Sequence, residues 1–374
     1  MNKTFFSPFT ITSKEQVSPT AFILRIRPDD GNGDGDSTST PSKQQQLQEA
    51  WRHGLWSVEI KQPQLQIARH YTPLPPTSDS EGGTAPAELR FLIRRVDRGE
   101  MSTYLSKLRV GETVWLRGPH LGFDVEKRLG AAENVVFVAG GTGIAPALQV
   151  ARRVLGSTSS RGGDTKPSVS ILWANRRAVD ALGRAQNSQN SSSGKGSWFS
   201  NWRRNEAPAS IQDDQRKLDE SILSQQIRDL EKKYPAQFRM QYFIDEESTF
   251  IKPQDLQPLL AIPKNRQQQQ QQQQLLPAAT SCPWHAASAL EKLPDDNDAE
   301  RGGLDCVCVQ GTKHASPAKV GANLVCVSGP DGFVEAYAGA KRWFAGTEMQ
   351  GPVRGVLGRV MADKKGENWL VLKL

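Results

Sequence analysis

The chain has 374 residues, of which 37% are hydrophobic and 23% are charged, and its formal net charge is +7. At about 100–200 residues per domain, this length predicts two domains with some sequence outside their cores. Four cysteines are too few for a disulfide-dense secreted scaffold. Because 40 acidic residues are interspersed among 47 basic ones, we do not expect nucleic-acid binding; a basic surface also suits anionic cofactors and acidic protein partners.

No run approaches the roughly 20 consecutive apolar residues of a membrane helix, so we expect no transmembrane segment in this chain, and peripheral membrane association stays open. Three segments are rich in Gly, Ser, Asn, Asp or Gln, and the last contains eight consecutive Gln. Such segments bury too little apolar surface to offset the entropy of ordering them. We interpret them as disordered surface insertions, at residues 29–50, 183–210 and 263–322.

The first part of the chain has the pattern of an all-β domain. Between Phe5 and Val125, apolar residues form short β-rich runs that Pro and Gly turns separate. We therefore predict an antiparallel β-barrel over residues 1–130. Its expected strands include residues 21–26, 55–61, 89–96 and 112–117.

From residue 134 onward the pattern changes to strand, glycine turn and helix. Residues 135–139 form a continuous apolar run that suits a strand buried on both faces. Alternating strands and helices predict a doubly wound parallel α/β domain over residues 131–374. The other expected strands are 169–174, 238–244 and 324–327, and the expected helices are 147–155, 215–234 and 333–344.

The best candidate site is the glycine turn at residues 140–146, Gly-Gly-Thr-Gly-Ile-Ala-Pro. Glycines allow a tight turn and close backbone approach, so a pyrophosphate can bind the free N–H groups at the N-terminus of the following helix. The turn departs from the G-x-G-x-x-G fingerprint because Pro146 stands in place of the third glycine. A simple link between strand and helix is the alternative.

Two weaker signals lie in the β-rich half. Residues 69–74, Arg-His-Tyr-Thr-Pro-Leu, offer a cation for a phosphate, a ring for a planar heterocycle and a hydroxyl for a hydrogen bond. Residues 99–105, Gly-Glu-Met-Ser-Thr-Tyr-Leu, can hold a second phosphate through Ser102 and nearby backbone N–H groups. Taken alone, the second signal is better explained by an ordinary serine cap of a short helix.

Taken in order, these motifs resemble those of a known family. Residues 69–72, 99–102, 118–122 (Gly-Pro-His-Leu-Gly), 140–146 and 329–333 (Gly-Pro-Asp-Gly-Phe) follow one another as in the ferredoxin-reductase-like flavoproteins. The sequence is most similar there to the NADH-cytochrome b5 reductases. The resemblance implies an FAD-binding barrel followed by an NAD(P)-binding domain, with the active site between them.

The resemblance also implies roles for individual residues. Arg69 is expected to bind the flavin pyrophosphate, Tyr71 to lie against the isoalloxazine, and Thr72 to hydrogen-bond near its N5. Met101 and Ser102 are expected to hold the FAD phosphates. The expected nicotinamide-nucleotide ligands are Gly140, Gly141, Thr142, Gly143, Pro146, Gly329 and Pro330, and the residues expected at the reaction itself are Thr72 and Ser328.

Some positions depart from the family pattern. The family usually has Cys where this chain has Ser328, and Cys326 lies two residues earlier, so we expect slower hydride transfer. Ala145 replaces a frequent Thr. After the second strand of the α/β domain we identify no acidic residue to meet a ribose 2′-OH, and Arg176 and Arg177 can instead pair with a 2′-phosphate. NADH is the expected donor on overall resemblance, with NADPH as the alternative.

The implied function is transfer of hydride from NAD(P)H to FAD, followed by electron transfer to a haem protein or haem. Residues 328–333, 341–344, 348–352 and 355–358 resemble those of a narrower group, the fungal mitochondrial flavoproteins that assist haem attachment to cytochrome c. That group implies a mitochondrial location, with the cytoplasm as the alternative. Two rival functions stay open: a reductase for a quinone or another small-molecule acceptor, and a flavin-binding assembly factor with little hydride transfer.

Other candidate residues are set aside. Metal-ligand residue types occur within the third insertion at irregular spacing, so we expect no metal site. His70 is expected to point away from Arg69 and Tyr71, and His120 to lie in a turn; neither is expected to act as a base. The residues considered for a metal are Cys282, His285, Cys306, Cys308 and His314.

Overall fold

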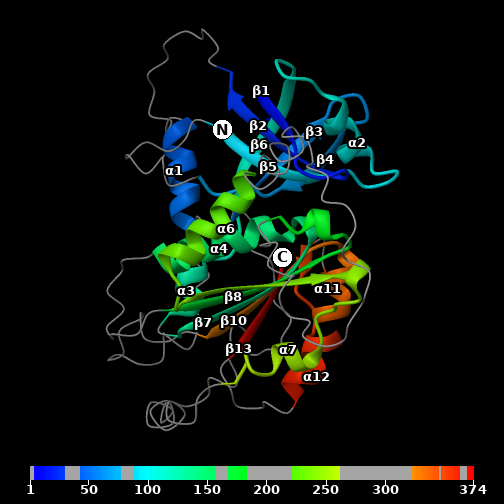
Figure 1. Cartoon of the computed structure of the whole chain (residues 1–374). Coiled ribbons are helices and arrows are strands. Elements are labelled where there is room, and N and C mark those ends of the chain that lie inside the picture. The colour runs from blue at the N-terminus through cyan, green and yellow to red at the C-terminus, as the bar shows by residue number, and fades with distance from the viewer. Residues whose placement is uncertain are drawn as a thin grey trace, which may run out of the picture.

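The computed structural model describes residues 4–29, 43–76, 88–130, 132–156, 167–182, 221–261, 322–344, 347–362 and 369–374. The first part of this chain forms a six-stranded antiparallel sheet in the order β4-β3-β6-β1-β2-β5 (Figure 1). Alternating apolar residues of these strands build one core, which contains Phe9, Leu24, Val58 and Phe91. The strands are β1 (Ser7–Gln16), β2 (Ala21–Pro28), β3 (Trp56–Gln62), β4 (Ile67–Tyr71), β5 (Leu89–Arg94) and β6 (Thr113–Leu121).

Two helices pack against this sheet, α1 (Lys43–His53) and α2 (Glu100–Lys107), whereas the short helix α3 (Val125–Leu129) packs on the parallel sheet described below. Helix α1 corrects the prediction that residues 29–50 are a disordered surface insertion, because its Leu47 and Ala50 are buried in the core of this sheet. Leu47, Ala50 and Trp51 recur at helical spacing within a Gln-rich segment, so one apolar face suffices to dock the helix. Residues 30–42 lie outside the described part.

The second part forms a five-stranded parallel sheet in the order β13-β10-β7-β8-β9. The predicted two-domain fold, an antiparallel sheet followed by a doubly wound parallel one, is confirmed. The predicted division into residues 1–130 and 131–374 remains a proposal. The strands are β7 (Asn134–Gly140), β8 (Ser168–Asn175), β9 (Phe238–Ile244), β10 (Asn323–Ser328) and β13 (Trp369–Lys373).

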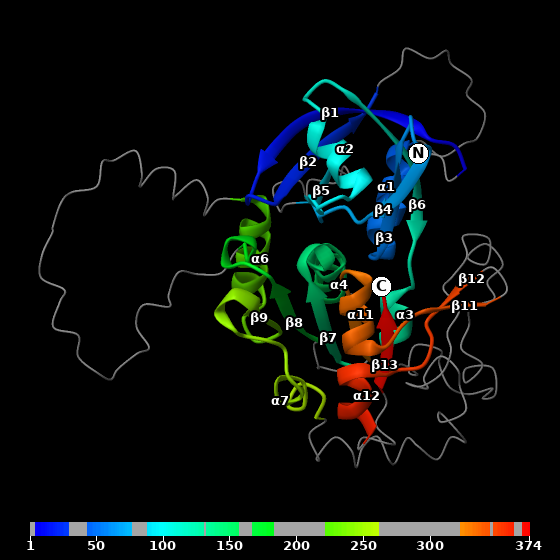
Figure 2. The ribbon, with the colours of Figure 1, turned by 90° about the vertical axis from the view of Figure 1, so that its right-hand side faces the viewer.

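Helices cover both faces of the parallel sheet (Figures 1 and 2). On one face, α4 (Ile144–Gly156), α6 (Ile222–Lys233) and α3 pack over Val135, Phe137 and Ile171. On the other face, α7 (Pro253–Leu256), α11 (Asp331–Ala338) and α12 (Gly355–Ala362) pack over Val136 and Val325. Among the described residues, no helix is long and apolar enough to cross a membrane.

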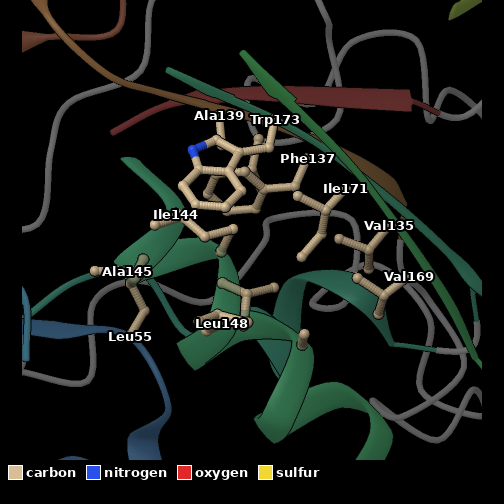
Figure 3. Packing of buried hydrophobic residues seen from close by; sticks show 14 of the residues in the cluster. Leu55, Val135, Phe137, Ala139, Ile144, Ala145, Leu148, Val169, Ile171 and Trp173 are labelled. Atoms are coloured by element: carbon tan, nitrogen blue, oxygen red, sulfur yellow. The ribbon is translucent and has the colours of Figure 1, made fainter. Parts of the chain in front are cut away.

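Helix α4 lies between the parallel sheet and the antiparallel one. Its Ala145 and Leu148 belong to the same buried cluster as Leu55 of the segment before β3 (Figure 3). Gln149 of α4 accepts a hydrogen bond from the Trp56 backbone N–H at 3.0 Å and donates one to the Pro73 carbonyl at 2.9 Å. The two sheets therefore share packed side chains and paired polar groups through this helix.

Three predicted elements have different ends in the structure. Helix α4 starts at Ile144 and includes Pro146, because proline tolerates the first helical turn, where an N–H has no partner. Helix α11 ends at Ala338 instead of continuing to residue 344, since Gly339 adopts a φ of +85°. The chain then forms a two-stranded sheet of β11 (Arg342–Phe344) and β12 (Thr347–Met349). Of the predicted helix 215–234, residues 215–220 lie outside the described part.

Candidate active site

The glycine turn and the Ser328–Pro330 segment meet at the carboxyl edge of the parallel sheet. Strands β8 and β9 lie on one side of β7, whereas β10 and β13 lie on the other, so the strand order reverses between β7 and β10. Open parallel sheets bind ligands in the crevice at such a reversal. Gly140 ends β7 and Ser328 ends β10, which places both predicted nucleotide motifs at this point.

The contact between the two motifs requires glycine. A Cβ on Gly143 would lie 2.3 Å from the Ser328 carbonyl oxygen, well inside van der Waals contact. Gly141 has a φ of +55°, and its carbonyl accepts a hydrogen bond from the Trp173 indole N–H at 2.8 Å. The single 3₁₀ turn η2 (Gly141–Gly143) then leads directly into α4. The chain thus places backbone N–H groups of a helix N-terminus at the crevice.

The predicted flavin motif lies at the edge of the antiparallel sheet. Arg69 and Tyr71 share one face of the edge strand β4, Arg69 is exposed, and Tyr71 packs partly against the core. Burial raises the pKa of the Tyr71 phenol to about 12, although the Arg69 charge opposes this rise, so the phenol stays protonated at neutral pH. Thr72 follows directly and is half-buried.

Helix α2 packs against β4, so the structure brings the second predicted phosphate motif beside the first. Met101 and Ser102 are both buried in the first turn of α2. The Ser102 hydroxyl accepts a hydrogen bond from the Val96 N–H at 3.0 Å and donates one to the Gly99 carbonyl at 3.2 Å. This hydroxyl closes the loop before α2, and the assignment of Ser102 to the FAD phosphates stays a prediction.

Two charged residues at the junction of the domains were missed by sequence reasoning. Arg94, at the end of β5, forms an ion pair of 2.8 Å with Asp180, which is 6% exposed. Asp180 also accepts hydrogen bonds from the hydroxyls of Ser18, at 2.5 Å, and Thr20, at 3.1 Å. A Cβ on Gly141 would lie 3.1 Å from an Arg94 nitrogen, so this guanidinium lies directly over the glycine turn. In the sequence, Arg94 is marked only as a cation at the end of an apolar strand.

Acidic residues at the end of β9 were also missed. Strand β9 leads into η4 (Asp245–Glu247) beside the segment that follows β8. Glu246 donates its backbone N–H to the Arg176 carbonyl at 3.1 Å, and its carboxylate accepts the Ala178 N–H at 2.5 Å. The acidic residues thus come from the third strand, whereas sequence reasoning searched only behind the second strand.

The outer face of the antiparallel sheet carries a cluster of His70, His120, Arg117 and Glu59. As predicted, His70 points away from Arg69 and Tyr71, and it lies 3.6 Å from Glu59. His120 was predicted in a turn but belongs to β6, where it lies 3.5 Å from Glu59. Burial opposes the ionisation of Glu59, but the Arg117 hydrogen bond and the nearby histidines lower its pKa. This cluster lies on the face opposite Arg69 and Tyr71.

Ser328 and Cys326 share one face of β10, and Ser328 ends the strand, with its backbone carbonyl beside Gly143. Cys326 is fully buried in the hydrophobic core, and burial raises the pKa of its thiol to about 12. Among the described residues, no group of three or more His, Cys, Asp or Glu is placed to hold a metal ion. The five Cys and His residues considered for a metal lie outside the described residues, so the absence of a metal site stays a prediction.

The residues at the junction fit anionic dinucleotides. At the glycine turn, Arg94 of the antiparallel sheet supplies a cation over Gly141, and the buried amide of Asn175 at the end of β8 has no hydrogen-bond partner among the described residues. On the antiparallel sheet, exposed Arg69 supplies a second cation beside the Tyr71 ring. Such groups match phosphates, sugar hydroxyls and a planar ring system.

Two family models match the chain: "Oxidoreductase FAD-binding domain" over residues 39–124 and "Oxidoreductase NAD-binding domain" over residues 137–233. The chain carries an FAD-binding and an NAD-binding oxidoreductase domain. The predicted cofactor classes are thereby confirmed, and so is the resemblance to the ferredoxin-reductase-like flavoproteins.

Curated relatives include NADH-cytochrome b5 reductase 1 of Emericella nidulans, which is 31% identical over 117 residues, 31% of this chain and 35% of that protein. The cytochrome c mitochondrial import factor CYC2 of Saccharomyces cerevisiae is 28% identical over 133 residues, 33% of this chain and 34% of that protein. The matched segments thus span about a third of each of these relatives.

A solved structure of the CS-b5R domains of human Ncb5or, in its NAD+ form, has the same fold, with a TM-score of 0.51 and 15% identity over 98% of this chain and 69% of that chain.

Proposed function

We propose that this protein is an FAD-dependent oxidoreductase that takes electrons from NADH and passes them to a haem protein or haem. The observation that carries the proposal is the convergence of the glycine turn and residues 328–330 beside β7 and β10, at the junction with the antiparallel sheet. When bound, FAD and the nicotinamide supply the redox chemistry, in which two electrons enter together and leave singly. The protein's task is to bind and orient them.

On the antiparallel sheet, Arg69 would pair with the flavin pyrophosphate because its guanidinium is exposed at the sheet edge. Tyr71 would lie against the flavin ring as a neutral phenol, and Thr72 would donate a hydrogen bond to the ring edge. The first turn of α2, with Met101 and Ser102, would hold phosphate oxygens through backbone N–H groups.

On the parallel sheet, the glycine turn and the N-terminus of α4 would bind the nicotinamide nucleotide's pyrophosphate. This ligand set consists of Gly140, Gly141, Thr142, Gly143 and Pro146. Arg94 would add a cation there, exchanging its pairing with Asp180 for one with the phosphates. Gly329 and Pro330, after Ser328, would flank the nicotinamide.

NADH is the favoured donor. The 2′-phosphate of NADPH carries about two negative charges at neutral pH. At the end of β9, Asp245, Glu246 and Glu247 would repel it, although Arg176 and Arg177 on the neighbouring segment offer some compensation. Three carboxylates against two exposed cations favour the unphosphorylated nucleotide.

A haem-type acceptor is favoured because the relatives include NADH-cytochrome b5 reductases and a cytochrome c mitochondrial import factor. We further propose a role in mitochondrial cytochrome c maturation, because one relative is a cytochrome c mitochondrial import factor. Two alternatives are a quinone or small-molecule reductase and a flavin-binding assembly factor. Replacement of the family's usual Cys by Ser328 favours the assembly factor, because it alters the reaction cleft itself.

Acceptor profiling tests the proposal. FAD-loaded protein is given NADH or NADPH together with cytochrome b5, cytochrome c, haem or a soluble quinone, and acceptor reduction is followed by absorbance. We expect faster turnover with NADH and with a haem acceptor. Faster quinone reduction would favour the first alternative, and no turnover with any acceptor would favour the assembly factor. The control variant is Arg69→Ala, which removes the cation proposed to pair with the flavin pyrophosphate and should therefore weaken FAD binding.

A further inference from the structure

One buried carboxylate connects the two parts of the chain beside the glycine turn. Asp180 ends η3 (Ala178–Asp180), the 3₁₀ turn that follows β8, and it is 6% exposed. Its Oδ2 atom pairs with the Arg94 guanidinium of β5 at 2.8 Å. Its Oδ1 atom accepts hydrogen bonds from the hydroxyls of Ser18 and Thr20, which lie between β1 and β2. All three partners come from the antiparallel part of the chain, so Asp180 links it to the parallel part.

The Arg94 guanidinium lies where a pyrophosphate would bind. A Cβ on Gly141 would lie 3.1 Å from the Nη1 atom of Arg94, so this nitrogen covers the glycine turn. A phosphate needs the same space to reach the backbone N–H groups of the turn. Nucleotide binding therefore displaces the Arg94 side chain. Moving the guanidinium aside by the width of a phosphate breaks its contact with Asp180.

The contacts around this ion pair allow it to open. Arg94 is held through Nη2, whereas its buried Nε atom has no hydrogen-bond partner among the described residues. Part of its capacity to bind an anion is therefore unused. Ser18 is fixed independently of Arg94, because its hydroxyl oxygen accepts the Ala21 N–H at 3.0 Å. The hydroxyls can thus keep the Oδ1 atom of Asp180 in place after Arg94 has moved.

Opening the ion pair is electrostatically unfavourable. Removing the cation from a buried carboxylate leaves a charge that no opposite charge compensates. The hydroxyls of Ser18 and Thr20 stay bound to Asp180, but they are neutral. Binding energy of the nucleotide must offset this loss, because a ligand that binds only the open arrangement has a lower observed affinity.

We propose that Asp180 holds Arg94 over the glycine turn and competes with the nucleotide's pyrophosphate for this guanidinium. Asp180 thereby weakens nucleotide binding and speeds the release of NAD+. It is a positioning residue, since it acts through Arg94 and touches neither cofactor. This proposal rests on the proposed function, because it assumes that the glycine turn binds the nucleotide's pyrophosphate.

The test measures binding of ADP-ribose to the FAD-loaded protein by calorimetry, since this probe has the pyrophosphate but no nicotinamide. Asp180→Asn removes the charge and keeps an oxygen that can accept the two hydroxyls. The matched control is Glu126→Gln, because Glu126 pairs with Arg153 at 2.5 Å in the last turn of α4, away from the glycine turn. Arg94→Gln is made alone and together with Asp180→Asn.

We expect Asp180→Asn to bind ADP-ribose about tenfold more tightly than wild type, the ratio that one hydrogen bond to a charged group produces. Glu126→Gln should keep the wild-type affinity. In the Arg94→Gln background, Asp180→Asn should gain about twofold at most, because no guanidinium remains to be released. An equal gain in both backgrounds would mean that Asp180 repels the phosphates directly, and it would overturn the proposal.

Ser18→Ala tests the proposal in the opposite direction, without depending on the folding of an Asp180 variant. It removes a hydroxyl that supports Asp180 once Arg94 has moved, so ADP-ribose should bind about threefold more weakly. Unchanged or stronger binding by Ser18→Ala would contradict the proposal.

Unchanged or weaker binding of ADP-ribose by Asp180→Asn would also overturn it, because the carboxylate would then not compete for Arg94. The proposed function would stand in that case, since wild type still binds the nucleotide. If FAD-loaded wild type binds neither ADP-ribose nor NAD+, the role of Asp180 and the proposed function fail together.

Discussion

The two edges of the parallel sheet differ in how their polar groups are used. At the amino edge, Asn134 of β7 and Asn323 of β10 bond to each other, and Ser168 of β8 donates to Asn134 at 3.0 Å. At the carboxyl edge, the same three strands end in a glycine turn, a buried Ser328 and an unpartnered Asn175. The amino edge is therefore built for stability, whereas the carboxyl edge leaves polar groups for a ligand.

The edge strand β13 sharpens this contrast. At its carboxyl end, Lys373 is 1% exposed and donates to the carbonyls of Ala340, Gly351 and Pro352 at 3.1–3.3 Å. This end of the sheet is closed by the protein itself. The open part of the carboxyl edge thus lies at β7, β8, β9 and β10, and the match to the NAD-binding domain begins within β7 and continues through α6.

Gly143→Ala should have the largest effect on the carboxyl edge. Its Cβ would meet the Ser328 carbonyl at 2.3 Å, and overpacking of this kind costs about 1–3 kcal/mol. We expect NAD+ affinity to fall by about tenfold to a hundredfold, as calorimetry on FAD-loaded protein would show. The matched control is Gly156→Ala at the end of the same helix, where a Cβ meets nothing within 4 Å. Equal affinities for the two variants would contradict the assigned contact.

Asn323→Ala should affect the amino edge without changing the site. It leaves the part-buried Asn134 N–H without its acceptor, which costs about 1–3 kcal/mol of the free energy of unfolding. Urea denaturation measures this loss, and NAD+ affinity should remain at the wild-type value. If Asn323→Ala lost NAD+ affinity but kept its free energy of unfolding, the amino edge would serve binding instead of stability, which would contradict this assignment.

Ser328→Cys tests the reaction cleft. Because related reductases usually have Cys at this position, we expect the variant to reduce its flavin up to about tenfold faster, a barrier change of about 1.4 kcal/mol. Anaerobic stopped-flow mixing with NADH gives the rate, and Cys326→Ser serves as the control because Cys326 is fully buried. If Ser328→Cys reduced its flavin at the wild-type rate, the side chain at position 328 would not influence flavin reduction.

Lys373 should make the free energy of unfolding depend on pH, because the cost of burying its charge is fully present at neutral pH and is relieved in alkali. Burial and the charges of Lys341 and Arg342 lower its pKa from 10.5 to about 8, so the unfolded chain binds more protons between these values. Its contribution to the free energy of unfolding should therefore rise as the pH increases from about 8 to about 10.5. The difference between wild type and Lys373→Met, followed by urea denaturation, should show this rise; a difference independent of pH would contradict it.

Much of this organisation could be predicted from local sequence patterns. The apolar runs of β3, β7 and β9 and the glycine turn have local signatures, and the order of motifs indicated both cofactor domains. Helix α1 was missed because its apolar face is narrow and surrounded by glutamines. The end of α11 was missed because a single glycine conformation determines it.

The missed site residues depend on long-range contacts. Arg94 and Asp180 lie 86 positions apart, and only the packing of the two sheets brings them together. Glu246 reaches the site because β9 pairs with β8. The importance of Asn175 follows from the absence of a partner among the described residues, which no sequence pattern encodes.

The central claim is that nucleotide bound at the carboxyl edge reduces flavin bound at the antiparallel sheet. Anaerobic addition of NADH to the FAD-loaded protein, with the visible flavin absorbance recorded over time, tests it most directly. We predict rapid bleaching with NADH and slower bleaching with NADPH. A bound flavin that stays oxidised with both donors would contradict the claim and favour an assembly factor that keeps the fold without the reaction.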